Sequence, residues 1–230
     1  MEDRAAKSAL FDRLAVVGKA FGSAKRLELI DLLSQGERTV ESVAREAGLG
    51  VSTASAHLQV LKLSNVVVTR REGTRIYYRL AGEDVAQLYA SMRTVAREHS
   101  ADVERALHSY LGVGALGDAD AEVTEVSREE LLELMSAGQV SLVDVRPREE
   151  YAAGHIPGSR SVPFGDLAAG LEPFADLSGD VEIVAYCRGA YCVLAHDAVR
   201  LLKAHGRRAR RLEDGLLEWR VHGLPVEVSA

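Results

Sequence analysis

The sequence contains two cysteines, Cys187 and Cys192, which stand close enough to share one loop. Cys187 ends an apolar run, 181–186, that predicts a strand, and a helix is predicted over about 191–205. The backbone N–H groups of such a loop can face the sulfur, and the helix N-terminus and Arg188 also favour a thiolate. We therefore expect Cys187 to be a nucleophile whose pKa lies below the roughly 8.5 of a free cysteine. The expected loop is Cys187, Arg188, Gly189, Ala190, Tyr191 and Cys192.

A thiolate in this setting can attack a sulfane sulfur and retain it as a persulfide. The alternative is that Cys187 is a buried structural thiol. Cys192 is open to two interpretations: it resolves a persulfide on Cys187 as a disulfide with release of sulfide, or it is packed and silent. The expected partners are an anionic or polysulfide sulfur donor and a thiol acceptor, and no cofactor is expected.

The elements that must position Cys187 alternate along residues 122–230. A helix over about 127–137 is followed by a short apolar run at 140–145, and the run at 181–186 leads into the helix after Cys187. Short apolar runs alternating with helices predict a mainly parallel sheet with helices on its faces.

Four motifs in this half resemble the rhodanese domain. They are the segments 142–151 (LVDVRPREEY), 154–159 (GHIPGS), 187–192 (CRGAYC) and 214–219 (DGLLEW). The resemblance implies that Asp144 and Arg146 brace the loop of Cys187. The loop departs from the usual enzyme at Gly189 and Cys192, which puts fast transfer from thiosulfate in doubt. Phosphatases of this fold need an arginine six positions after the cysteine, where Val193 stands, so phosphatase chemistry is not expected.

The first half predicts a different architecture. Helices are expected over about 4–20, 23–34, 39–47 and 51–63, and the segments 66–68 and 75–80 flank Gly73 as a β-hairpin. Two short helices joined at Gly48 and followed by a basic hairpin form a winged helix-turn-helix. The segment 47–80 resembles the ArsR/SmtB family of DNA-binding regulators, and the likeness covers about residues 10–110.

The helix at 51–63 and the hairpin carry the residues expected to contact double-stranded operator DNA. Short polar side chains reach base edges or phosphates in a major groove, and arginines of the wing reach phosphates or the minor groove. Leu58 and Leu61 are expected to face the core. The predicted contact residues are Ser52, Thr53, Ser55, His57, Gln59, Lys62, Arg70, Arg71 and Arg75.

A single long helix is expected over about 83–111. Its apolar residues recur at three-to-four spacing, which favours lengthwise packing against another helix and predicts a homodimer. Family members bind metals through a Cys-x-Cys pair, which 37–43 lacks, or through Asp and His on the last helix. The acidic and histidine residues here do not reproduce that pairing, so no metal site is expected. They are Glu98, His99, Asp102, Glu104 and His108.

Composition agrees with two globular domains. The chain of 230 residues is 47% hydrophobic and 27% charged. Residues 1–112 carry 16 Lys and Arg against 14 Asp and Glu, so the negative net charge of −6 comes from the remainder. No apolar run of 18 residues and no secretory signal are found, so we expect a cytoplasmic protein without a membrane span.

The predicted fold class is therefore mixed. We expect an all-α winged helix-turn-helix with a β-hairpin wing at 1–112, a linker at 113–121 and an α/β rhodanese-like domain at 122–230. Three functions remain: a sulfur- or redox-responsive regulator, in which the regulator is expected to be a repressor; a rhodanese-type sulfurtransferase that controls its own operon; and a metal-responsive repressor with an inert rhodanese fold. The missing cysteines at 37–43 argue against the third, and the sequence does not separate the first two.

Overall fold

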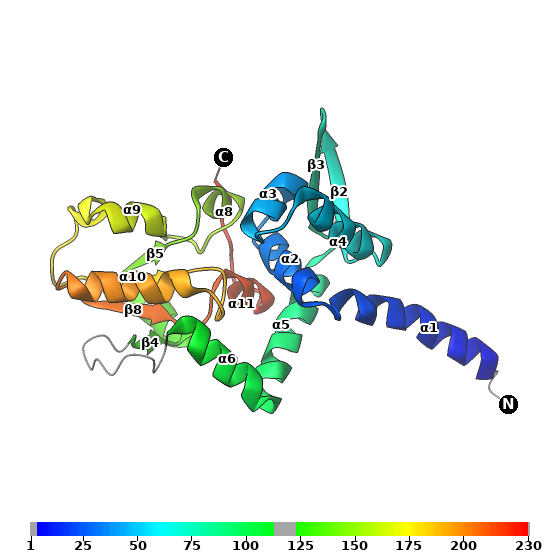
Figure 1. Ribbon diagram of the computed structural model, residues 1–230. Helices are drawn as coiled ribbons and strands as arrows, with labels where there is room; N and C mark the ends of the chain where they lie inside the picture. The colour runs from blue at the N-terminus through cyan, green and yellow to red at the C-terminus, as the bar shows by residue number, and fades with distance from the viewer. Residues whose placement is uncertain (1–3, 113–122, 230) are drawn as a thin grey trace. The chain divides into compact units, whose positions relative to one another are not determined.

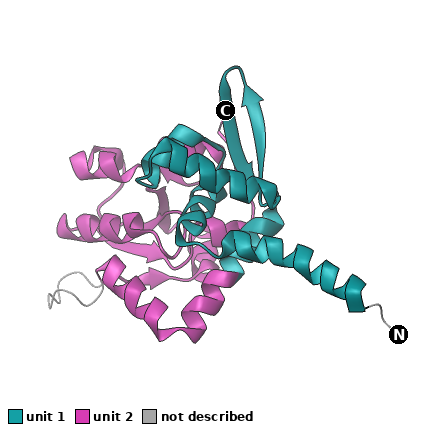
Figure 2. Ribbon diagram, turned by 45° about the vertical axis from the view of Figure 1, so that its right-hand side comes forward, with its two compact units in different colours: residues 1–91 teal, residues 92–230 magenta. Residues whose placement is uncertain are grey.

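The computed structural model describes residues 4–112 and 123–229, and the expected linker at 113–121 lies outside the described residues. The chain forms two compact units that divide between Ser91 and Met92, inside helix α5 (Glu83–His99) (Figure 2). The domain boundaries expected from the sequence therefore remain a prediction.

The first unit is a helical domain with a small antiparallel sheet (Figure 1). Strands β2 and β3 form the expected hairpin, and Gly73 adopts φ +57° in its turn, a conformation that favours glycine. The strand order is β1-β3-β2. The elements before α5 are α1 (Arg4–Phe21), α2 (Ala24–Ser34), β1 (Arg38–Thr39), α3 (Val40–Glu46), α4 (Val51–Leu63), β2 (Val67–Glu72) and β3 (Arg75–Leu80).

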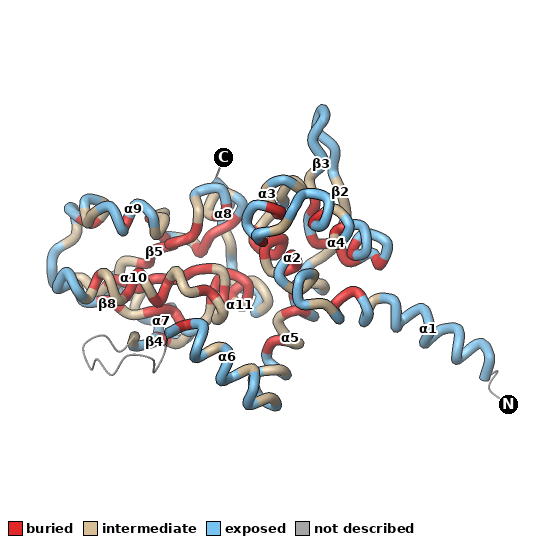
Figure 3. The backbone as a smooth tube through the Cα atoms, in the orientation of Figure 1, coloured by how far each residue is buried: buried red, intermediate tan, exposed pale blue. Residues whose placement is uncertain are grey.

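The core of this unit lies between α2, α3, α4 and α5. Leu29, Ile30, Leu58 and Leu61 are all fully buried, which confirms the predicted inward direction of Leu58 and Leu61. Thr39 caps α3, because its side chain accepts a hydrogen bond from the N–H of Ser42 at 3.3 Å. Helix α1 is mostly exposed along its length (Figure 3).

The predicted single helix over 83–111 is wrong. Ser100 adopts an extended conformation, with φ −129° and ψ 102°, and separates α5 from α6 (Ala101–Leu111). Serine is favoured before the first turn of a helix, which periodicity alone does not reveal. Within the second unit α6 contacts helix α10 (Val193–Ala204), and Arg200 donates to the carbonyl of Leu111 at 3.0 Å.

The second unit contains a five-stranded parallel sheet in the order β4-β8-β7-β5-β6, as expected for a rhodanese-like domain. Several of its elements are too short for periodicity to reveal. The elements after α6, apart from α10, are β4 (Glu125–Val126), α7 (Arg128–Ser136), β5 (Val140–Asp144), α8 (Arg148–Ala153), β6 (Arg160–Ser161), α9 (Phe164–Ala169), the 3-10 helix η1 (Glu172–Phe174), β7 (Glu182–Tyr186), β8 (Ala209–Leu212) and α11 (Leu216–Val221).

Both faces of the sheet are covered, and strand β7 is central. Ile183 and Ala185 belong to one hydrophobic cluster, while Val184 and Tyr186 belong to another that includes Trp219 of α11. All four of these β7 residues are fully buried. A continuous apolar run is what a parallel strand buried on both faces requires. Cys187 follows this strand directly, so a strand that is packed on both sides positions the thiol.

Candidate sulfur-transfer site and DNA-binding face

Cys187 lies at the carboxyl end of β7 and is only 1% exposed. Its Sγ is 3.4 Å from the carbonyl oxygen of Cys192 and also interacts with the Cys192 thiol. Cys192 is buried as well and stands as the N-cap residue of α10. The loop closes on itself, because the N–H of Cys192 donates to the carbonyl of Gly189 at 3.0 Å. The structure thus brings the two free thiols together.

The expected direction of the Cys187 pKa is wrong. Burial raises the pKa of the Cys187 thiol well above its usual value, and the neighbouring Cys192 adds to this. The hydrogen bond from Cys187 instead lowers the pKa of Cys192, with further help from the backbone of Arg188 and Leu194. A group at a helix N-terminus is well placed to hold negative charge. Of the two thiols, Cys192 therefore ionises more readily than Cys187.

A glycine outside the loop fixes its shape. Gly215 precedes α11, and a Cβ atom at this position would lie 2.2 Å from the backbone nitrogen of Gly189. This approach lets the N–H of Leu216 donate to the carbonyl of Cys187 at 3.0 Å and the N–H of Leu217 donate to that of Arg188 at 3.2 Å. The sequence motif 214–219 points to a rhodanese-like domain, but it does not reveal that α11 holds the loop.

Asp144 and Arg146 are fully buried. The Arg146 guanidinium donates to both carboxylate oxygens of Asp144, at 2.9 Å from Nε to Oδ1 and 2.6 Å from Nη2 to Oδ2, and to the carbonyl of Gly154 at 2.7 Å. Asp144 is paired in register with Tyr186, the residue before Cys187. The pair therefore lies beside the strand end from which the loop of Cys187 begins.

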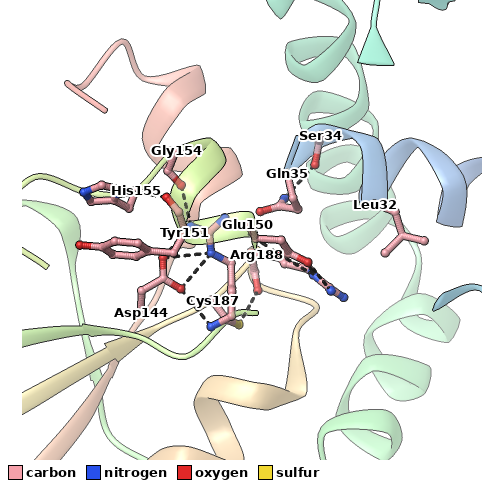
Figure 4. Close-up of polar contacts among 12 residues, drawn as sticks. Leu32, Ser34, Gln35, Asp144, Glu150, Tyr151, Gly154, His155, Cys187 and Arg188 are labelled. Carbon is pink, nitrogen blue, oxygen red and sulfur yellow. Dashed lines mark hydrogen bonds and ion pairs between the residues drawn. The ribbon is translucent and has the colours of Figure 1, made fainter. Parts of the chain in front are cut away.

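Glu150, in α8, connects this pair to the loop, and sequence analysis does not single it out. It is 2% exposed, and its carboxylate accepts from Arg188 at 3.0 Å (Nε) and 2.5 Å (Nη2) (Figure 4). Arg146 Nη1 lies 4.0 Å from Glu150 Oε2. We expected the positive charge of Arg188 to favour a thiolate at Cys187. In the structure the Arg188 guanidinium is paired with the Glu150 carboxylate. A buried carboxylate needs such partners. In the sequence, however, Glu150 is one of several acidic residues, and nothing there marks it as buried.

The remaining loop residues differ in exposure. Gly189 is buried, while Ala190 and Tyr191 are half-buried. The carbonyl oxygen of Gly189 lies 3.9 Å from the Cys187 Sγ.

Helix α4 displays the residues that the sequence assigned to base and phosphate contacts. Ser52, Thr53 and Gln59 are exposed, and Ser55 and His57 are half-buried. Gln59 is partly committed, since its Nε2 donates to the hydroxyl of Tyr78 on β3 at 3.3 Å. The exposure of this face leaves its polar groups accessible to a partner.

The basic residues of the wing are not equivalent. Lys62, Arg71 and Arg75 are exposed, and Arg71 donates to the carbonyl of Gly73 at 3.0 Å. Arg70, also exposed, forms ion pairs with Glu37 at 2.5 Å and with Glu72 at 2.7 Å. These two carboxylates compete with any phosphate for Arg70.

Two family models match separate parts of the chain. The bacterial regulatory protein, arsR family, matches residues 23–68, and the rhodanese-like domain matches residues 127–222. The HTH-type transcriptional regulator Rv0324 of Mycobacterium tuberculosis is 54% identical over 224 residues, which covers 97% of this chain and 94% of that protein. The chain belongs to the arsR family of bacterial regulatory proteins. It is a DNA-binding transcription regulator that also carries a rhodanese-like domain.

Two shorter likenesses concern one domain each. The thiosulfate:glutathione sulfurtransferase of Homo sapiens is 47% identical over 47 residues, which is 20% of this chain and 41% of that protein. The homodimeric winged helix-turn-helix domain Mb0332 from Mycobacterium bovis is 53% identical and covers 44% of this arsR-family chain and 93% of its own, with a TM-score of 0.41. None of the helices among the described residues is long and apolar enough to cross a membrane.

Proposed function

We propose that this arsR-family regulator responds to reactive sulfur and that Cys187 is the residue that accepts it. One observation carries the proposal: Cys187 ends the central strand in a loop shared with a second free thiol, and buried partners hold that loop. A thiol whose only task was to fill the core would need neither Glu150 beneath the loop nor Gly215 against it.

The loading step is a displacement at sulfur. The Cys187 sulfur attacks the outer sulfur of thiosulfate, the S–S bond of thiosulfate breaks, and sulfite leaves with the electron pair of that bond. With a polysulfide donor the leaving group is the polysulfide shortened by one sulfur. In either case Cys187 becomes a persulfide, and the proton that it carried moves to the Cys192 thiolate, its hydrogen-bond partner.

Cys192 has a second task in this proposal. Cys192 returns its proton to the outer sulfur of the persulfide, and the Cys192 thiolate then attacks the Cys187 Sγ. A Cys187–Cys192 disulfide forms, the S–S bond of the persulfide breaks, and the outer sulfur leaves as HS⁻. Reduction by a thiol acceptor returns both residues to the starting state. The dithiol, persulfide and disulfide are three chemical states of one loop, and a regulator can distinguish them through the shape of that loop.

The DNA-binding half acts as a homodimer on operator DNA in this proposal. Leu10, Phe11 and Leu14 of α1 are 57% to 66% exposed, and an apolar face of this size is typical of a protein–protein interface. Two recognition helices then read half-sites one helical turn apart, so the operator is an inverted repeat. Footprinting tests this, and protection of one half-site by a monomer contradicts it.

The decisive experiment compares DNA binding by the reduced, persulfidated and disulfide forms of the full chain. We expect the Kd for the operator to change at least about tenfold between the reduced and one sulfur-modified form. Cys187→Ser should accept no sulfur from thiosulfate or polysulfide, as read by mass spectrometry. Cys192→Ser should still load, at about a tenth of the wild-type rate at pH 7 because its proton acceptor is lost. Loading of Cys192 in the Cys187→Ser protein at the wild-type rate contradicts the assignment.

A second candidate function is sulfur transfer by turnover, with DNA binding that controls the protein's own operon. The likeness to a thiosulfate:glutathione sulfurtransferase favours it. Steady formation of sulfite from thiosulfate with glutathione as acceptor, together with a Kd for DNA that ignores the state of Cys187, would support this function over sulfur sensing.

A further inference from the structure

A buried arginine outside the rhodanese motifs contacts the loop of Cys187. Arg93 lies in the part of α5 that belongs to the second unit and is 7% exposed. Its guanidinium carbon is 4.1 Å from the centre of the Tyr191 ring, and the Tyr191 hydroxyl donates to the Arg93 carbonyl at 3.2 Å. Tyr191 therefore contacts α5 through both its ring and its hydroxyl.

The same guanidinium forms an ion pair with Glu218 of α11, with 3.2 Å between Arg93 Nη2 and Glu218 Oε1. Glu218 also accepts from the N–H of Gly215, the residue that abuts the loop, at 3.0 Å. A Cβ atom on Gly189 would lie 2.9 Å from Glu218 Oε2 and 3.1 Å from Arg93 Nη1. Arg93 and Glu218 thus lie directly against the backbone between the two cysteines.

Burying the ion pair between Arg93 and Glu218 has a cost in free energy. Removing an arginine from water is expensive, and a buried ion pair is often no more stable than a hydrophobic replacement of equal size. The pair therefore contributes little to stability that leucine could not. What it adds is geometry, since a planar guanidinium can stack on Tyr191 and pair with Glu218 at once.

Helix α5 is anchored in the first unit only one turn earlier. Tyr89, which is 6% exposed, donates its hydroxyl to Asp31 of α2 at 3.1 Å. Ala86 is fully buried in the same unit. Tyr89 and Arg93 belong to the same helix, which continues from the first unit into the second. The helix carrying Arg93 is thus also part of the DNA-binding unit's core.

We propose that Arg93 is a positioning residue for the loop of Cys187 and that it couples the state of that loop to helix α5. The proposal rests on the function proposed above and names the route by which the sulfur state reaches the DNA-binding unit. A persulfide or a Cys187–Cys192 disulfide needs the backbone of residues 188–192 to move. That movement alters how Gly189 and Tyr191 pack against Arg93. Because coupling is reciprocal, a change in α5 alters the loop by the same free energy.

The first test measures amide hydrogen exchange of residues 188–192 in the reduced full chain. Arg93→Met keeps the apolar stem and removes the stack and the ion pair, and exchange in the loop should rise about tenfold. Arg97→Met removes an exposed arginine one turn along α5 and should change it less than about twofold. Arg93→Lys restores the charge and should fall between them. Equal loop exchange in Arg93→Met and wild type overturns the proposal.

The pH profile of Cys187 alkylation gives a readout that a purely structural residue would not move. An opened loop hydrates Cys187, so its alkylation midpoint should fall in Arg93→Met and return toward the wild-type value in Arg93→Lys. If Arg93→Met does not fold, exchange of residues 92–99 in the wild type replaces this arm. Alkylation of Cys187 should then speed exchange there, and unchanged exchange overturns the proposal.

DNA binding separates this inference from the function on which it rests. In Arg93→Met, Cys187 should still load sulfur, but the change in operator Kd on loading should shrink from at least about tenfold to less than about twofold. If the operator Kd of Arg93→Met still changes at least about tenfold on sulfur loading, the proposed coupling is overturned. A wild type whose Kd ignores sulfur loading contradicts the proposed function instead, and the exchange measurements still decide the role of Arg93 in the loop.

Discussion

The two functional regions of this regulator are built in opposite ways. On helix α4 the residues expected to reach DNA are exposed or half-buried, and Gln59 donates a long hydrogen bond to Tyr78. Around Cys187 the supporting residues Asp144, Arg146 and Glu150 are buried. Short hydrogen bonds join Arg146 to Asp144 and Arg188 to Glu150. The polar groups of the first region are accessible to a partner, whereas those of the second region are hydrogen-bonded to one another inside the fold.

The difference follows from what each partner supplies. DNA brings phosphates and base edges that order flexible polar side chains on binding, so the protein needs only to present them on a rigid helix. A small sulfur donor offers far fewer groups to bind. The loop that receives it must be shaped beforehand, and each buried polar group that shapes it needs its own partner. Mutations should therefore destabilise the protein at the sulfur site and weaken binding at the DNA face.

The largest effect is expected at Glu150. Glu150→Gln keeps the shape of the side chain but leaves Arg188 and Arg146 without their shared carboxylate. Removing one partner of a buried ion pair should lower the free energy of unfolding of the second unit by about 3 kcal/mol, at the lower end of the usual range because Arg188 is partly exposed. Urea unfolding measures it, and the neighbouring exposed Glu149→Gln is the matched control. Equal stabilities of the two variants would show that the network does not hold the loop.

The sequence predicted the parts of this comparison that depend on local pattern. Alternating apolar runs and helices indicated the parallel sheet, and the strand before Cys187 placed the thiol at its carboxyl end. The helices of the DNA-binding unit before α5 agree with the structure to within one or two residues at most ends.

Features that depend on contacts between distant segments could not be predicted. Glu150 pairs with Arg188 across 38 positions, and Gly215 meets Gly189 only because α11 folds back on the loop. The direction of the Cys187 pKa was missed for the same reason, since burial depends on the whole core and here outweighs the backbone of the loop. The break at Ser100 was missed because apolar spacing continues across it.

A buried histidine tests whether the other buried polar groups of the second unit also have hydrogen-bond partners. His196 of α10 is 4% exposed, and neither ring nitrogen has a hydrogen-bond partner among the described residues. Burial, followed by the charge of Arg211, lowers the pKa of His196 to about 4. The unfolded chain therefore takes up a proton near pH 6.5 that the folded chain refuses.

Stability should consequently fall as the pH drops from about 6.5 to about 4, by about 3 kcal/mol in total. Above about pH 6.5 the histidine is neutral in both states and contributes no pH dependence. His196→Leu should flatten the curve over this range, while the exposed His205→Leu should leave it unchanged. Thermal unfolding at several pH values measures it. An unaltered curve in His196→Leu would mean that other groups cause the loss.

Gly215→Ala isolates the shape of the loop from its charges. The added Cβ would meet the Gly189 nitrogen at 2.2 Å, so α11 and the loop must separate. We expect a loss of about 1–3 kcal/mol in stability and a much slower loading of Cys187. Gly165→Ala is the control, because nothing lies within 4 Å of its Cβ position. Loading at the wild-type rate by Gly215→Ala would show that the hydrogen bonds from α11 do not shape the sulfur site.

The smallest effects are expected on the DNA face, where arginines in different settings share one hairpin. Arg71 and Arg75 are exposed, so Arg71→Ala or Arg75→Ala should weaken binding to all sequences by roughly tenfold without lowering stability. The slope of log K against log salt should flatten by about one unit for each phosphate that the variant no longer binds. A change in sequence preference at constant slope would instead assign these arginines to bases.

Arg70 provides the contrast within the same wing. Its guanidinium is already paired with Glu37 and Glu72, so DNA must displace two carboxylates before a phosphate can bind. Arg70→Ala should therefore weaken DNA binding less than Arg71→Ala, and it should flatten the salt dependence less. Glu37→Gln should release Arg70 and tighten non-specific binding. If Arg70→Ala instead weakens DNA binding as much as Arg71→Ala, the ion pair between Arg70 and Glu37 breaks when DNA binds. Arg70 is then as available to DNA as the exposed residues of α4.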